Sequence, residues 1–334
     1  MGRRGRDDPA GAESTGASGL VGRIWSAPYL LVLVPPLMWS GNILLSRGLA
    51  ETLPPVGLAF WRWVGAVAVL APFVLPRLIA QRALLRAHAG VILVAGLFGI
   101  AAYNTLVYQA LQTTPALNAT LIGSLMPLAI PLAARLILGD RIAPRQIAGI
   151  VISFLGVVWI VARGDPRTLA AFEVTPGDLW MLAAVASWAI YSAVVRLKPA
   201  AMSPWVFMAA TMTVGLVMLI PFLALEVAGG RSMPLTAVSV GVVAYVAVFA
   251  SVLAYLCWNR TVGLIGPTRT GLAIHLMPVL VGALAFVFLD EPIRFFHLAG
   301  AVLIATGIAV ALTTPAAGRA ANSAQGTTGR SAGR

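Results

Sequence analysis

The chain has 334 residues, of which 59% are hydrophobic and only 10% are charged, whereas an ordinary soluble domain has about 25% charged residues. A water-soluble fold of this length cannot bury so much apolar surface, so much of the chain must have lipid as its solvent. The net charge of +12 is spread in short clusters between apolar runs, which favours contacts with anionic lipid headgroups and argues against a nucleic-acid partner.

Ten apolar runs are predicted to cross the membrane, since a helix needs about 20 mostly apolar residues to do so. Polar tails rich in Gly, Ala, Ser and Thr, at 1–24 and 314–334, are predicted to be disordered. The predicted spans are 28–46, 55–75, 89–111, 116–138, 145–162, 178–196, 204–226, 235–258, 267–288 and 293–312.

The positive charges of the loops predict the orientation of these spans. If successive loops alternate between the two sides, Lys and Arg favour the side of the N-terminus by roughly three to one, and cytoplasmic loops are the ones that retain such residues. The sequence therefore predicts a multi-pass protein of the inner (plasma) membrane with both termini in the cytoplasm.

The two halves of the chain resemble each other. Leu125-Met126-Pro127 matches Leu276-Met277-Pro278 after a shift of 151 residues, and a shift of 149 matches earlier positions. An odd number of five helices in each half inserts the second copy upside down, an arrangement typical of alternating-access transporters. We therefore predict an all-α membrane protein of two inverted five-helix repeats, at 25–163 and 176–313. The other matched pairs are Gly149 with Gly300, Gly156 with Gly307, Trp39 with Trp188, Arg47 with Arg196 and Pro55 with Pro204.

Several motifs resemble one transporter family. Tyr108-Gln109-Ala110-Leu111, Met126-Pro127 and Met277-Pro278 with Asp290-Glu291-Pro292 look like the paired EamA-type domains of the drug/metabolite transporter superfamily. Phe60-Trp61-Arg62-Trp63 also looks like the Arg-containing second helix of that family. The resemblance implies a ten-helix bundle that carries amino acids, other metabolites, nucleotide sugars or toxic compounds, with the YddG-like exporters of amino acids and aromatic metabolites similar in layout. Asp140 stands where the family usually has Glu.

Polar residues inside the spans are the candidates for function, because such groups are costly in a membrane. No Asp or Glu lies deep in any predicted span, which argues against carboxylate-based exchange of protons for cations. His275 is the one midspan histidine, and either solute binding with proton coupling or a simple structural hydrogen bond fits it.

Aromatic and amide side chains predict the solute-binding site. Trp39 and Trp188 occupy matching midspan positions, and Asn42 and Tyr191 follow one helical turn later. Aromatic faces beside amides or hydroxyls suit amphipathic solutes, although packing or lipid contact is the alternative for each. The predicted solute-binding residues are Trp39, Asn42, Tyr103, Asn104, Trp188, Tyr191, Tyr255 and His275.

Other residues in the spans have mainly structural interpretations. Pro127 and Pro278 are predicted to kink their helices and to free carbonyls for gating. Arg62 is expected to extend to the outer headgroups, with contact to a solute carboxylate as the alternative. The matched glycines of the fifth and tenth spans are expected to let helix backbones approach closely.

A secondary transporter that exports an amphipathic metabolite, an amino acid, is the function that these features favour. The alternatives are a drug exporter, a nucleotide-sugar carrier, a receptor or scaffold without transport, and a membrane enzyme. The sequence has neither a phosphate-binding Gly-Lys-Ser/Thr loop nor His/Glu zinc spacing, so we predict no cofactor, no metal and no enzymatic activity. The expected partners are the solute, membrane lipids and protons if transport is coupled to them, in a monomer or weak oligomer.

Overall fold

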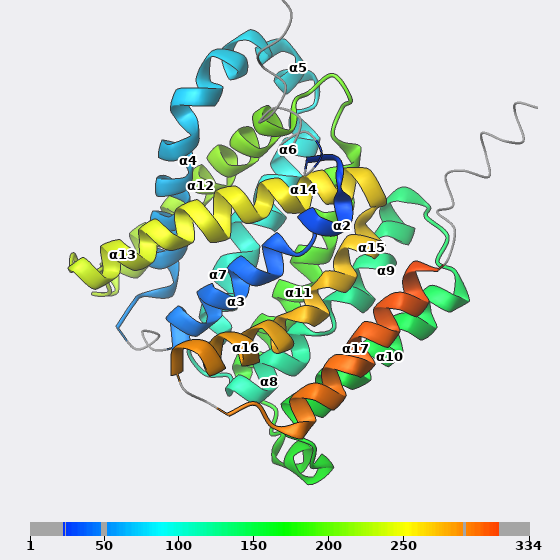
Figure 1. Ribbon diagram of the computed structural model, residues 1–334. Coiled ribbons are helices and arrows are strands. Elements are labelled where there is room, and N and C mark those ends of the chain that lie inside the picture. The colour runs from blue at the N-terminus through cyan, green and yellow to red at the C-terminus, as the bar shows by residue number, and fades with distance from the viewer. Residues whose placement is uncertain (1–22, 24, 48–51, 290–291, 314–334) are drawn as a thin grey trace, which may run out of the picture.

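Regular structure in the described residues of this computed structural model is entirely helical (Figure 1). The structure describes residues 23, 25–47, 52–289 and 292–313, so apart from Arg23 the two predicted tails lie outside it, as do Asp290 and Glu291. In chain order the elements are α2 (Pro28–Leu31), α3 (Val34–Arg47), α4 (Pro55–Ala80), α5 (Arg82–Ala87), α6 (Ala89–Ala95), η1 (Gly96–Ala102), α7 (Tyr103–Ala110), α8 (Ala116–Gly123), α9 (Met126–Leu138), α10 (Pro144–Val161), η2 (Pro166–Ala171), α11 (Pro176–Val194), η3 (Val195–Leu197), α12 (Pro204–Ala228), α13 (Ala237–Tyr245), η4 (Val246–Leu253), α14 (Ala254–Ile265), α15 (Pro267–Gly271), η5 (Leu272–Leu276), α16 (Met277–Leu289) and α17 (Phe295–Leu312).

All ten predicted spans are helical. Nine stretches within the described residues are long and apolar enough to cross a membrane, and they coincide with the last nine predicted spans. The first predicted span, 28–46, contains α2 and α3, which are separated by a short turn. That break was not predicted, although Pro35 and Pro36 explain it. They lie in the first turn of α3, and proline has no N–H to bond to the preceding turn.

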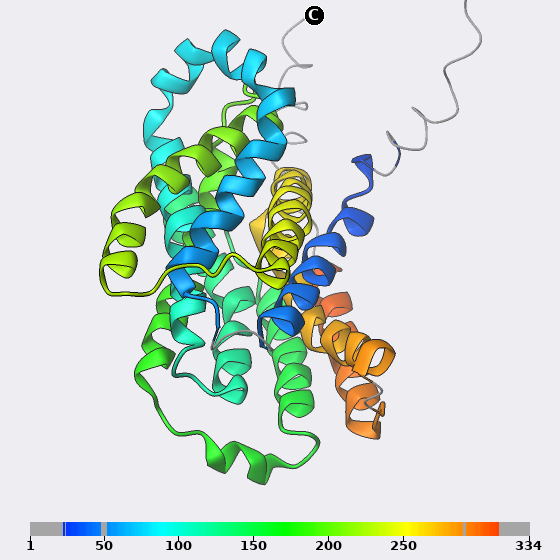
Figure 2. The ribbon, with the colours of Figure 1, turned by 90° about the vertical axis from the view of Figure 1, so that its left-hand side faces the viewer.

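Helices from the two halves of the chain pack against each other throughout the bundle. The helix α11, from the second half, packs against α7, α8, α9 and η1, while α4 packs against α12 and η4. Figure 2 shows α12 and α4 towards one side of the bundle and α16 and α17 towards the other. The core is therefore an interface between the two halves.

The most extensive helix pair in the described part of the chain is formed by α10 and α17, one from each half, which lie side by side in Figure 1. A Cβ atom built on Gly149 would lie 2.5 Å from the carbonyl oxygen of Gly307, and one on Gly156 would lie 2.8 Å from that of Gly300. The order of the pairs shows that the helices are antiparallel. The expectation that these matched glycines allow close packing is confirmed, because only a residue without a side chain fits at these distances.

The fourth and ninth spans are both interrupted next to their matched prolines. The fourth span breaks between α8 and α9, and Pro127 lies in the first turn of α9. The ninth passes from α15 through the 3₁₀ helix η5 to α16, whose second residue is Pro278. The predicted irregularities are therefore present, since each proline removes one backbone donor. Their role in gating stays a prediction.

The third and eighth spans each contain a π-helical segment, at η1 and η4, in matching places of the two halves. The sequence did not predict either segment. π-Helical turns are rare and are found mostly at functional sites, because the wider turn leaves carbonyls available to side chains. Both segments supply carbonyl oxygens to the site described below.

Two acidic residues at span ends have structural partners. The carboxylate of Glu226 accepts hydrogen bonds from the backbone N–H groups of Val56 (3.1 Å) and Gly57 (2.6 Å), at the first turn of α4. Asp178 Oδ2 accepts from the backbone N–H of Thr175 (2.8 Å) and from Asn118 Nδ2 (2.9 Å), which ties α8 to α11. Carboxylates at helix N-termini satisfy free backbone donors and the helix dipole.

Candidate functional site

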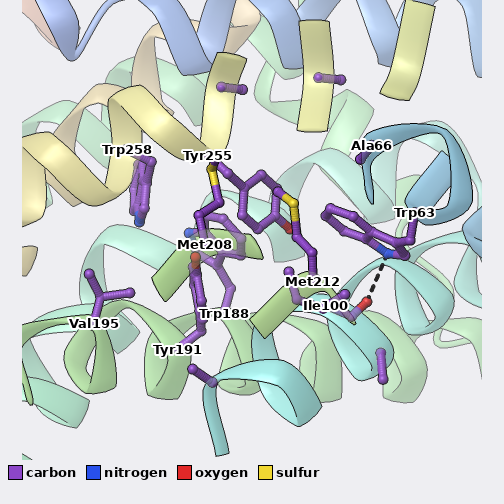
Figure 3. Packing of buried hydrophobic residues seen from close by; sticks show 14 of the residues in the cluster. Trp63, Ala66, Ile100, Trp188, Tyr191, Val195, Met208, Met212, Tyr255 and Trp258 are labelled. Carbon is purple, nitrogen blue, oxygen red and sulfur yellow. Dashed lines mark hydrogen bonds between the residues drawn. The ribbon is translucent and has the colours of Figure 1, made fainter. Parts of the chain in front are cut away.

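Aromatic side chains from both halves meet in one buried cluster, with Trp188 at its centre (Figure 3). The Trp188 ring lies 5.1 Å from that of Trp39 at an interplanar angle of 89°, 4.6 Å from Tyr103 and 5.4 Å from Tyr255. These separations are typical of edge-to-face and tilted aromatic pairs. The aromatic cluster consists of Trp39, Trp63, Tyr103, Trp188, Tyr191, Tyr255 and Trp258.

Hydroxyl and amide groups join the rings of the aromatic cluster to the π-helical segments. The Tyr255 hydroxyl donates to the carbonyl oxygen of Gly99 in η1 (2.8 Å) and accepts from Asn104 Nδ2 (3.1 Å). Trp39 Nε1 donates to the carbonyl oxygen of Ala250 in η4 (3.0 Å). Trp63 Nε1 likewise donates to a carbonyl of η1, as the dashed line in Figure 3 shows. The carbonyls of both segments therefore orient the aromatic rings.

Three buried N–H groups of the site have no acceptor within the described protein. They are the indole nitrogens of Trp188 and Trp258 and the amide nitrogen of Asn259. The two indole rings lie 5.1 Å apart, and Asn259 accepts a hydrogen bond from the Tyr191 hydroxyl (2.8 Å) through its oxygen. Buried donors nearly always have a partner. Three such donors, on two rings in contact and on the residue that follows one of them, suit a ligand that carries acceptor oxygens.

Arg62 points into the bundle, so the expectation that it extends to the outer headgroups is wrong. Its side chain is 1% exposed, and its guanidinium donates to Asn104 Oδ1 (2.7 Å), Ser251 Oγ (2.8 Å), Tyr108 OH (2.9 Å) and the Ala250 carbonyl (3.0 Å). The headgroup expectation failed because these acceptors come from η4 and α7, which are distant in sequence.

Positions that match in the two repeats contact each other across the centre of the bundle. Trp39 packs against Trp188, its partner in the shift of 149. Asn104 donates to Tyr255, and His275 is bonded to the Ser124 carbonyl, both across a separation of 151 residues. Equivalent residues can meet in this way only on an axis that relates the two halves. The site is therefore at the interface of the repeats.

His275 lies apart from the aromatic cluster. One ring nitrogen is 2.7 Å from Ser153 Oγ on α10, and the other is 3.0 Å from the Ser124 carbonyl at the break of the fourth span. The neighbouring ring that the structure records is Phe154. The segment η5 packs against α3, α9, α10 and α17, and solute binding by His275 stays a prediction.

The other predicted site residues fall into two groups. Tyr103, Asn104, Tyr191 and Tyr255 join Trp39 and Trp188 at the cluster, while Asn42 is half-buried on α3. Sequence reasoning left Trp63, Trp258 and Asn259 outside the predicted set. Trp258 follows Tyr255 by one helical turn, the same spacing that selected Asn42 and Tyr191. That spacing was an available signal for it.

Fold and site together define a multi-pass membrane protein of the transporter class, with a buried aromatic and cationic site between two helical repeats. The chain belongs to the EamA-like transporter family, whose model matches it twice, at residues 26–162 and 175–313. The ten-helix repeat fold expected from the sequence is that of this family.

Named relatives agree with this assignment. The chain is 29% identical to the uncharacterized transporter YyaM of Bacillus subtilis, over 85% of this chain and 92% of that protein. It is 27% identical to a probable terminal-alkyne amino-acid exporter of Streptantibioticus cattleyicolor, over 65% of this chain and 71% of that protein. It is 31% identical to the aromatic amino acid exporter YddG of Ancylobacter novellus, over 31% of this chain and 35% of that protein.

Proposed function

We propose that this protein is a secondary transporter that exports a small amphipathic metabolite, an amino acid, by alternating access. The observation that carries the proposal is the aromatic cluster between the repeats, with the unpartnered donors of Trp188, Trp258 and Asn259. Aromatic faces suit the apolar part of such a solute, and N–H donors suit its carboxylate or carbonyl oxygens. Two relatives named as amino-acid exporters support the same solute class.

The position of the site supports alternating access. The repeats meet at Trp39 with Trp188 and at Asn104 with Tyr255, so a rocking motion of one half against the other changes the contacts of a solute held there. The breaks at Pro127 and Pro278 give the fourth and ninth spans points at which they can bend. Export, with both termini in the cytoplasm, is the direction that the two relatives named as exporters favour.

A binding screen followed by flux measurement tests the proposal. Detergent-purified protein is heated with a panel of amino acids, other metabolites and nucleotide sugars, since a ligand specific to the folded state raises the apparent melting temperature. Each ligand found is then followed in proteoliposomes by counterflow. We expect an amino acid with a large apolar side chain to bind and to be transported. A panel in which no amino acid binds, or binding without flux, contradicts the proposal.

A matched pair of tryptophans on α11 provides the control for the site. Trp188→Ala is expected to reduce solute affinity at least tenfold, because this ring contacts five other rings of the cluster. Trp180→Ala removes a ring of the same size that is 47% exposed on the outer face of the helix, and it is expected to leave affinity unchanged. Equal solute affinities in the two variants would show that the aromatic cluster is not part of the solute-binding site.

A further inference from the structure

Arg62 brings a full positive charge into the bundle without a negative partner among the acceptors that the structure gives it. The guanidinium bonds to the side-chain oxygens of Asn104, Tyr108 and Ser251 and to the Ala250 carbonyl, all of which are neutral. It also lies 4.8 Å from the centre of the Trp63 ring. These contacts satisfy four of its five N–H groups, but none of them neutralises the charge.

The two acidic residues at the ends of the described spans form hydrogen bonds to groups other than Arg62. Glu226 holds the backbone N–H groups of Val56 and Gly57, roughly 9 Å along α4 from Arg62 at 1.5 Å per residue. Asp178 holds Asn118 and the start of α11. By sequence, no span carries Asp or Glu near its middle. A buried charge without a counter-charge is costly and is typical of a functional group in a membrane protein.

The neighbours of Arg62 connect it to the aromatic cluster. The Ala250 carbonyl accepts from both Arg62 Nη2 and Trp39 Nε1. Asn104 bonds to Arg62 through its oxygen and to the Tyr255 hydroxyl through its nitrogen. A ligand group bound at the guanidinium is therefore separated by a single residue, Ala250 or Asn104, from the rings that would hold the apolar side chain of the ligand.

We propose that Arg62 binds the carboxylate of the transported solute and so restricts the cargo to amphipathic monocarboxylates. This inference rests on the proposed transport function and names the group that selects its solute. A carboxylate supplies one negative charge and a flat pair of acceptors that matches the fork of a guanidinium. A phosphate with two charges fits less well, because the contacts recorded for Arg62 in the described part of the chain include no second cation.

Binding requires an exchange of partners at one nitrogen. Arg62 Nη1 donates to both Asn104 and Tyr108, and both acceptors are side chains on α7 that can rotate away. A carboxylate that takes one N–H of Nη1 and the remaining N–H of Nη2 displaces one of these two neutral acceptors and leaves the bonds to Ser251 and Ala250 in place. The exchange replaces a neutral contact with an ion pair, which favours the bound state in a medium of low dielectric.

The test compares acids with their carboxamides. Affinities of the purified parent are measured for L-phenylalanine, L-leucine and L-methionine and for the carboxamide of each, which keeps the side chain and amino group but loses the negative charge. We expect at least one acid to bind, at least tenfold more tightly than its carboxamide. Equal affinity for acid and carboxamide, or no binding by any of the three acids, overturns the inference. The proposed transport function is decided separately, by flux of whichever solute the wider screen identifies.

Variants then assign the preference to this side chain. Arg62→Gln is expected to bring the ratio of acid to carboxamide affinity to within about twofold, while Arg62→Lys, which keeps the charge but not the fork, retains part of the preference. Thr211→Val, at the matching position of the other half, where the hydroxyl bonds to the Met208 carbonyl, should keep the parental ratio. The proposal is contradicted if folded Arg62→Gln keeps the parental ratio of acid to carboxamide affinity. It is also contradicted if this ratio is higher in Arg62→Lys than in the parent.

Discussion

The packing of α10 against α17 gives a prediction whose size follows from the structure. A Cβ atom on Gly149 would lie 2.5 Å from both the Gly307 carbonyl oxygen and the backbone nitrogen of Ala311, whereas ordinary contacts begin at 3.4 Å. Gly149→Ala therefore requires the two backbones to separate by about 0.9 Å, and overpacking of this kind costs about 1–3 kcal/mol. Alanine recovers about 1 kcal/mol through its greater helix propensity, which leaves a net loss of up to about 2 kcal/mol.

The assay is the apparent melting temperature in detergent, measured at one fixed scan rate because membrane proteins seldom unfold reversibly. Gly241→Ala is the control, since a Cβ atom at Gly241 meets nothing within 4 Å on the exposed face of α13. We expect Gly149→Ala to melt at a lower temperature than the parent and Gly241→Ala to melt at the same or a higher temperature. Equal stability of the two variants would refute the argument from close packing.

Three further predictions follow from other parts of the chain. Single cysteines at Arg82 and Thr168, in a background without the native cysteine, should react with an impermeant thiol reagent from opposite sides of the membrane; labelling of both from outside contradicts the orientation. Asp178→Asn should lower the melting temperature, because a neutral amide oxygen accepts the two hydrogen bonds of Oδ2 more weakly than a carboxylate and lacks the negative charge that stabilises the start of α11, while solute affinity stays parental; a loss of affinity without a loss of stability would instead place Asp178 in the site. His275→Gln should abolish any uphill accumulation that a pH gradient drives in proteoliposomes, since no span carries a midspan carboxylate; equal accumulation in parent and variant contradicts this.

The interface between the halves has consequences for how substitutions should be interpreted. Three candidate site residues contact the other repeat: Trp39 contacts Trp188, Asn104 contacts Tyr255 and His275 contacts Ser124. A change at any of them therefore alters the contact between the halves as well as any contact with solute. For this reason, affinity and stability need to be measured together for every site variant. The control Trp180→Ala, at an exposed ring outside the cluster, separates the two effects on α11.

The sequence by itself determined which segments are long and apolar enough to cross the membrane and that the fifth and tenth spans have surfaces suited to close packing. Span lengths depend on local runs of apolar residues, which the bilayer thickness selects directly. The matched glycines and the pair Trp39 and Trp188 were also identified without the structure, because a repeated sequence places equivalent residues at equivalent depths. Six of the eight predicted solute-binding residues consequently meet at one cluster, namely Trp39, Tyr103, Asn104, Trp188, Tyr191 and Tyr255.

Tertiary structure alone decided which way the polar side chains point. Arg62 can reach headgroups or turn inward on the same helix, and it turns inward because its acceptors are supplied from positions 42, 46, 188 and 189 residues away. The sequence left His275 open between solute binding and a structural hydrogen bond, and only the folded chain supplies its partners, the Ser153 hydroxyl and the Ser124 carbonyl. The position of a residue within its apolar run predicts its depth in the membrane, whereas the direction of its polar side chain depends on hydrogen-bond partners that only the folded chain brings near.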